Sequence, residues 1–141
     1  MNFIKSKIDL IIDILSSSDY FDDVKIISAY PSEKKPTLIK KPGITISFKS
    51  VEINESFYLD SCRNKKITLG INFYLPLTMD SIEITGFLTN VIELLVFKNE
   101  LDVNSVKCAE PSYNREIDAF MVKSEFQINE PLYINDSMNI N

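Results

Sequence analysis

Histidine is absent from this chain of 141 residues, which contains only three glycines and two cysteines. The commonest general base and zinc ligand is therefore missing. Cys62 and Cys108 form no CxxC pair, so a zinc site would depend on carboxylates, which is unusual. Three glycines cannot supply a glycine-rich phosphate loop, and no GxSxG motif occurs. The sequence predicts no catalytic residues, no metal and no cofactor, and hence a protein that is not an enzyme.

A basic surface and a long hydrophobic run are also lacking. The net charge is -5 and the pI about 4.8, so nucleic acid is not expected as a partner. The first apolar stretch carries Asp9 and Asp13 and lacks a small-residue cleavage site, which is unlike a signal peptide. Because no run is long enough to cross a bilayer, we expect a soluble, intracellular protein without a membrane partner.

The composition is that of one globular domain. Hydrophobic residues make up 45% of the chain and charged residues 25%. A chain of this length buries about 68% of the surface that its unfolded form exposes, so it needs no disulfide or metal for stability. We expect a single α+β domain over residues 1–130 and a partly disordered C-terminal tail over 131–141.

The stretch from Lys65 to Asn99 organises the prediction. Its first half alternates with period two, which is typical of a half-buried strand. Pro76 cannot donate to a ladder and ends this strand. Asp80 is then a good helix N-cap, with Glu83 placed for a capping box and Met79 and Ile84 for a hydrophobic staple. The residues expected on one face are Ile67, Leu69, Ile71, Phe73 and Leu75 in the strand, and Ile84, Phe87, Leu88, Val91, Leu94 and Leu95 in the helix.

Two elements and a loop precede this stretch. The spacing of Ile4, Ile8, Ile11 and Leu15 predicts an amphipathic helix over residues 3–15 that packs on the sheet. Residues 24–30 predict a short strand, and the proline-rich segment after it predicts a long loop.

A long strand with an arm follows the loop. In GITISFKSVEI the apolar positions change parity after Ser50, which predicts a β-bulge near Lys49 and Ser50. The chain beyond it is predicted to project as a hairpin arm, with Asn64 in the turn region.

The remaining chain predicts two more strands. Residues 103–109 form the first and residues 120–128 the second, with a turn-rich EPSYNRE segment between them and Pro131 closing the last strand. The order is α-β-β-β-α-β-β, and we expect an antiparallel or mixed sheet with two helices packed on one face.

Two sets of side chains are weak candidates for a site. Carboxylates at Glu52, Glu55 and Asp60, or at Glu110, Glu116 and Asp118, could form a hydrolytic pair or a cation site, but no motif fixes their geometry and solvated loop positions are favoured. Tyr58, Tyr113 and Tyr133 could be interface anchors or be partly buried in their own fold.

The uneven charge suggests self-association. The lysines Lys34, Lys35, Lys40 and Lys41 form a basic loop, and Asp19, Asp22 and Asp23 form an acidic patch. Opposite patches on one domain suit head-to-tail contacts between copies. We therefore predict a subunit interface at these seven residues and at Tyr58. The alternative is a solvated loop and a solvated helix face.

The order of elements resembles a known family. The N-terminal helix, the crossing into GITISF, the bulged arm, ITLGINFYLPL followed by SIEITGFLTNVIELL, and a final pair ending in YNREIDAFMVKSEFQI resemble the tail terminator proteins of tailed phages and phage-tail-like particles. The resemblance covers roughly residues 3–128 and is one of topology.

The resemblance implies a structural assembly role without catalytic residues. Members form a ring, usually of six subunits, that caps the tail tube and joins it to head, neck or sheath. The resemblance implies that the partners are other copies of the chain, the tail tube, and sheath or neck proteins. It also implies that the protein is located in the bacterial cytoplasm during assembly and then in the particle. The alternative is a small protein-binding adaptor or assembly chaperone that uses the apolar helix face.

Overall fold

The computed structural model describes residues 3–28, 40–55, 62–98 and 101–133. Two helices and six strands make up a single α+β domain in the described residues, so the predicted fold class is confirmed. The elements are α1 (Phe3–Ser16), a 3-10 turn η1 (Asp19–Phe21), β1 (Lys25–Ser28), β2 (Gly43–Glu55), β3 (Cys62–Pro76), α2 (Ser81–Ile92), a π-helical turn η2 (Glu93–Phe97), β4 (Val103–Cys108), β5 (Ser112–Asn114) and β6 (Ala119–Tyr133).

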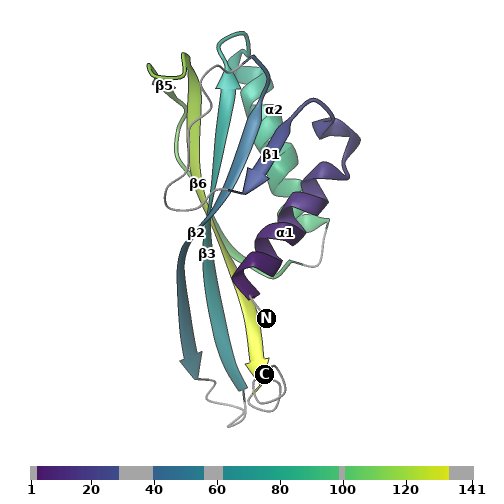
Figure 1. The fold of residues 1–141 in the computed structure, drawn as a ribbon, viewed down its shortest axis with the longest axis vertical. Helices are drawn as coiled ribbons and strands as arrows, with labels where there is room; N and C mark the ends of the chain where they lie inside the picture. The colour runs from purple at the N-terminus through teal and green to yellow at the C-terminus, as the bar shows by residue number, and fades with distance from the viewer. Residues whose placement is uncertain (1–2, 29–39, 56–61, 99–100, 134–141) are drawn as a thin grey trace.

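The six strands form one mixed sheet. Its order is β1-β2-β3-β6-β4, with β5 pairing on β6. The β1–β2 pair is parallel and the others are antiparallel. Both helices lie on one side of the sheet, and the other side is left without a helical layer (Figure 1). We call this second side the open face.

The core lies between the helices and the sheet. The predicted alternation in β3 is confirmed, because all five of its core-facing apolar residues are buried. Ile8, Ile11 and Leu15 of α1 and Ile84, Phe87, Val91 and Leu95 of α2–η2 complete one hydrophobic cluster. The apolar helix faces that the three- and four-residue spacing predicts are therefore the faces that pack on the sheet.

The start of α2 is fixed by its cap. Asp80 accepts a hydrogen bond from the Glu83 backbone N–H at 2.8 Å, and the Glu83 side chain accepts one from the Asp80 N–H at 3.2 Å. This capping box satisfies two backbone donors that a helix start leaves unpaired. At the other end the Lys98 N–H donates to the Glu93 carbonyl, and the helix ends in a π-helical turn that the sequence did not predict.

Replacing Asp80 with alanine is expected to lower the free energy of unfolding by about 1 kcal/mol, because the Glu83 N–H loses its acceptor. Urea denaturation followed by circular dichroism would measure the change. Ser81→Ala is the matched control, since Ser81 is the neighbouring exposed residue and its side chain makes no capping bond. Equal losses in the two variants would contradict the role of the cap.

The predicted bulge and arm are both present. The β2–β3 register shifts between Phe48 and Ser50, which leaves Lys49 as the extra residue. Beyond it, β2 and β3 continue as an arm that projects from the body (Figure 1). β6 runs alongside β3 through this whole length, so the arm has three strands where the sequence predicted a hairpin.

Two predictions about the arm are wrong. Asn64 is not in a turn region: it lies within β3, paired with Asn54 on one side and Pro131 on the other. Pro131 does not close the last strand, which continues to Tyr133. The N–H of Asn129 donates to the Asp102 carbonyl on the β4 side of β6. Residues two apart in a strand direct their backbone nitrogens to the same side, so the nitrogen of Pro131 also faces the β4 side, where β4 does not extend. Proline thus costs no ladder hydrogen bond.

Two smaller differences concern β5 and the end of the domain. β5 is a short strand inside the segment predicted as turn-rich. The domain boundary at residue 130 falls inside β6, and the chain after Tyr133 lies outside the described residues. Within the described parts of the chain, no helix is long and apolar enough to span a bilayer.

Candidate binding surfaces

The open face of the sheet carries polar side chains where the other face carries the core. Two neighbouring rows cross it. The first row joins Thr45, Asn72 and Lys123 across β2, β3 and β6. The second row joins Ser47, Gly70, Glu125 and Lys107 across β2, β3, β6 and β4. Strand alternation therefore gathers residues from four strands on one surface.

Gly70 allows Lys49 to lie flat against this surface. A Cβ atom at position 70 would lie 2.5 Å from Lys49 Cε, closer than two carbon atoms approach without a bond. Glycine in a strand interior commonly marks such a close approach. The bulge places Lys49 beside Gly70, and the absence of a side chain at Gly70 leaves room for the aliphatic stem of Lys49.

The same surface holds a buried polar atom that lacks a partner. Thr45 is buried, and its Oγ1 has no hydrogen-bond partner in the described part of the chain. Asn72, which lies opposite Thr45 in the ladder, is only 6% exposed. Most buried polar atoms in proteins are hydrogen-bonded, and one left unpaired costs about 1–3 kcal/mol. These two residues are adjacent in one row of the sheet.

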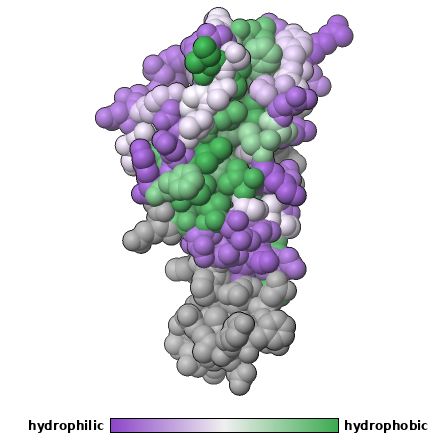
Figure 2. Space-filling model, turned by 180° about the vertical axis from the view of Figure 1, so that it is seen from behind, coloured by the Kyte–Doolittle hydropathy of each residue, from purple (hydrophilic) through white to green (hydrophobic). Residues whose placement is uncertain are grey.

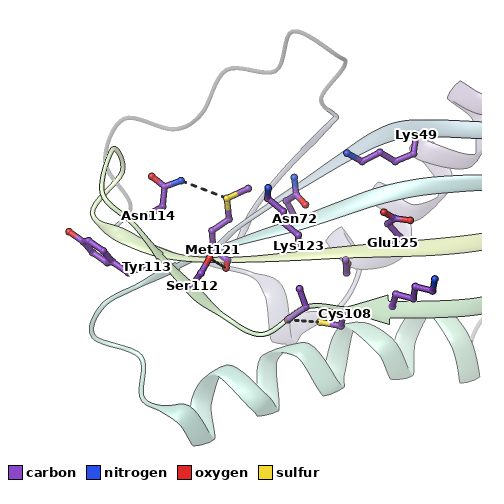
Figure 3. A pocket seen from close by; sticks show the side chains of 12 residues that line it. Lys49, Asn72, Cys108, Ser112, Tyr113, Asn114, Met121, Lys123 and Glu125 are labelled. Atoms are coloured by element: carbon purple, nitrogen blue, oxygen red, sulfur yellow. Dashed lines mark hydrogen bonds between the residues drawn. The ribbon is translucent and has the colours of Figure 1, made fainter.

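A cavity of about 600 Å³ opens over these rows (Figure 3). Lys49, Asn72, Lys123 and Glu125 lie toward one end of it, and Ser112, Tyr113, Asn114 and Met121 toward the other. Lys107, Cys108, Ala109 and Ser124 also line it. Ser124 is satisfied, because its hydroxyl donates to the Ile71 carbonyl at 2.5 Å. We call this feature the open-face cavity.

Two titratable groups at the cavity have perturbed pKa values. The Tyr113 hydroxyl donates to Asp118 Oδ1 at 2.5 Å, and this bond is the main reason that the pKa of Tyr113 is raised. Partial burial raises the pKa of the Cys108 thiol. The thiolate is the reactive form, so Cys108 is poorly suited to be a nucleophile near neutral pH.

The predicted charged interface is only partly within the described residues. Asp19, Asp22 and Asp23 are exposed around η1, and Lys40 and Lys41 are exposed before β2. The parallel pairing of Lys25 with Gly43 brings the two patches together within one chain, and Lys41 Nζ lies 3.8 Å from Asp23 Oδ1. Lys34, Lys35 and Tyr58 lie outside the described residues. The contact between copies stays a prediction.

The candidate carboxylates do not converge on the open-face cavity. Asp118 accepts the Tyr113 hydroxyl, and Glu116 and Asp118 are exposed residues beside β5 that do not line it. Glu52 is exposed on β2, while Asp60 and the side chain of Glu55 lie outside the described residues, as does the side chain of Tyr133. Among the described residues no group of three or more Cys, Asp or Glu is arranged to hold a metal ion.

The edges of the sheet form a second type of surface. On the β1 side, β2 pairs among the described residues only with β3 from Ser50 onward, and its residues Val51 and Ile53 are 36% and 50% exposed. On the β4 side, Leu88 and Ile92 of α2 and Val106 of β4 are half-buried and line a narrow crevice. Seen from behind, a band of hydrophobic residues runs down the molecule between polar margins (Figure 2). Apolar side chains are thus exposed at the β2 edge and half-buried at the β4 edge of one sheet.

No model of a known protein family matches the chain, and no curated protein has a significantly similar sequence. Sequence reasoning also missed the open-face cavity, although Gly70 inside an otherwise apolar strand was a signal of close approach.

Proposed function

We propose that this chain is a ring-forming structural subunit that caps and terminates a phage-type tail tube. The observation that carries the proposal is the pair of apolar edges on opposite sides of one sheet. A contact between two different surfaces of identical chains repeats from copy to copy, and it closes into a ring when the rotation per copy divides the circle.

The arm supplies the contact surface on one side. Val51 and Ile53 lie where β2 pairs on one side with β3 and, among the described residues, with no strand on the other, so backbone N–H and C=O groups of that edge are available for strand addition. The crevice lined by Leu88, Ile92 and Val106 supplies an apolar surface on the other side. Burying the two against each other would remove hydrophobic side chains from water, which favours association.

The order of elements also supports the proposal. The confirmed α-β-β-β-α-β-β order is the one on which the resemblance to tail terminators depends. Such a ring offers one flat side to the last tube layer and the other to a head, neck or sheath component. No catalytic group is needed for this role, because the ring acts by occupying the end of the tube.

Complementation of a strain that lacks this gene tests the proposal by electron microscopy of its particles. We expect the deletion to give tails of uncontrolled length or tails that never join a head. A Val51→Lys and Ile53→Lys double variant should fail to restore normal particles, because two desolvated ammonium groups would weaken the contact between copies more than about tenfold.

Ile82→Lys is the matched control. Ile82 is 81% exposed in the first turn of α2, so lysine there is expected to restore normal particles. Circular dichroism would establish that all variants fold. Complete particles in the deletion strain would refute the proposal. A stable one-to-one complex of the chain with a single other protein would instead favour the adaptor.

A further inference from the structure

The open-face cavity has two chemically different ends and is not required by the role in tail assembly. One end gathers three ammonium groups and one carboxylate, and the other carries a phenol, a thioether, a hydroxyl and an amide (Figure 3). We propose that the cavity binds a small organic phosphate with two or more negative charges, whose phosphates lie at the lysine end and whose uncharged part lies against Met121 and Tyr113.

The charge at the lysine end fits such an anion. Among the described residues that line the cavity, Lys49, Lys107 and Lys123 stand against one carboxylate, Glu125, which leaves two positive charges in excess. Glu125 lies directly opposite Lys107 in the ladder. The whole chain is acidic, with a net charge of -5, so this excess is local.

The type of cation favours phosphate over carboxylate. Arginine is the residue whose planar fork matches a carboxylate, and the described residues that line the cavity include none. A lysine ammonium acts as a compact point charge that can approach a tetrahedral phosphate from any side. Lysines from β2 and β6 therefore suit a phosphate held from two sides.

Asn72 gives the site a fixed polar group at its floor. Its side chain lines the cavity, and the residue is only 6% exposed. The amide NH₂ is a donor that a phosphate oxygen can accept from. Such a hydrogen bond would add a directed contact to the charge of the lysines.

The size and the second end fit an organic group attached to the phosphate. A cavity of about 600 Å³ lies within the range of small-molecule sites, roughly 300–1,000 Å³. Met121 and Tyr113 offer a thioether and an aromatic face, which pack against planar or apolar groups. Ser112 and Asn114 add hydrogen-bonding groups beside them.

Isothermal titration calorimetry of the full chain at low salt tests the proposal with three probes. ADP should bind, pyrophosphate should bind more weakly because it lacks the organic part, and adenosine should bind least because it lacks the charges. The affinity for ADP should fall as KCl is raised, since the contact is electrostatic.

Two glycine variants test the position of Lys49 without changing any charge. Gly70→Ala places a Cβ where Lys49 Cε lies, so Lys49 must move, and the affinity for ADP should fall about tenfold. The displaced group is the end of a flexible side chain, so the protein should still fold. Gly86→Ala is the matched control, because nothing lies within 4 Å of its new Cβ, and its affinity should be unchanged.

Charge removal completes the test. Lys49→Gln and Lys123→Gln should each weaken ADP binding about tenfold, while Lys98→Gln, at the end of η2, should not. Absence of heat with all three probes at millimolar concentration would overturn the proposal. So would ADP binding that is equal in the wild type, Lys49→Gln and Lys123→Gln, or binding of a polyglutamate peptide but of neither phosphate, which would indicate a protein partner.

Discussion

Replacing Phe87 with alanine is expected to lower the free energy of unfolding by about 3–5 kcal/mol. Phe87 is 3% exposed, and its ring centroid lies 5.4 Å from that of Phe21 and 6.0 Å from that of Phe73, both at nearly perpendicular angles. Edge-to-face pairs add about 0.5–1.5 kcal/mol each beyond the burial of their area. The side chain therefore joins α2, β3 and the segment after α1 in one cluster.

Urea denaturation with two spectroscopic probes would measure the loss. Ile82→Ala is the control on the same helix: Ile82 is 81% exposed, so its free energy of unfolding should change by no more than about 0.5 kcal/mol. A similar small change in Phe87→Ala would mean that the aromatic cluster is not a main source of stability. Non-coincident transitions would show that the two-state analysis does not apply.

Deleting Lys49 from the middle of β2 is expected to leave the protein folded, with a free energy of unfolding within about 1 kcal/mol of the wild type. Phe48 pairs with Leu69 and Ser50 with Thr68, so Lys49 has no partner in the ladder. Its removal makes the pairing continuous and keeps the register on both sides. The bend of the arm should decrease, and assembly of the proposed ring should fail even though the subunit folds.

Deleting Thr45 from the same strand is the contrasting control. Ile46 and Phe48 would then turn to the open face, and Ser47 and Lys49 would turn toward the core, because a shift of one residue reverses the faces of a strand. We expect a loss of more than about 4 kcal/mol or no folding at all. Circular dichroism and thermal denaturation would compare the two deletions. Equal destabilisation would contradict the description of Lys49 as the extra residue of a bulge.

Local patterns predicted most of the fold. The alternation from Ile67 to Leu75 fixed β3 and its buried face, and Asp80 with Glu83 fixed the start of α2. The parity change after Ser50 located the bulge. Each of these features depends on residues close together in the chain, and this is the range over which periodicity and capping act.

The errors depend on neighbours that are remote in sequence. Pro131 is tolerated because β4 does not extend that far along β6, which the residues around Pro131 do not reveal. Asn64 is a common turn residue, but here the ladders to β2 and β6 hold it in β3. Pairing within the sheet therefore overrides the preference of asparagine for turns.

The open-face cavity could not be predicted for the same reason. Lys49, Asn72 and Lys123 are spread over three strands, and only the register brings them together. The candidate residues chosen from local charge runs were instead exposed or outside the described residues, and Lys41 has a partner in its own chain. Gly70 was the one local signal of the cavity, and it does not identify the residue that approaches it.

The position of β6 has a consequence for how the protein is made. β3 lies between β2 and β6, and β6 begins at Ala119, far after β3 ends at Pro76. During synthesis, one whole backbone edge of β3 stays without its strand partner until β6 has left the ribosome. Closing so long a loop is slow relative to local pairing. A chain that stops before β6 would therefore lack the centre of the sheet.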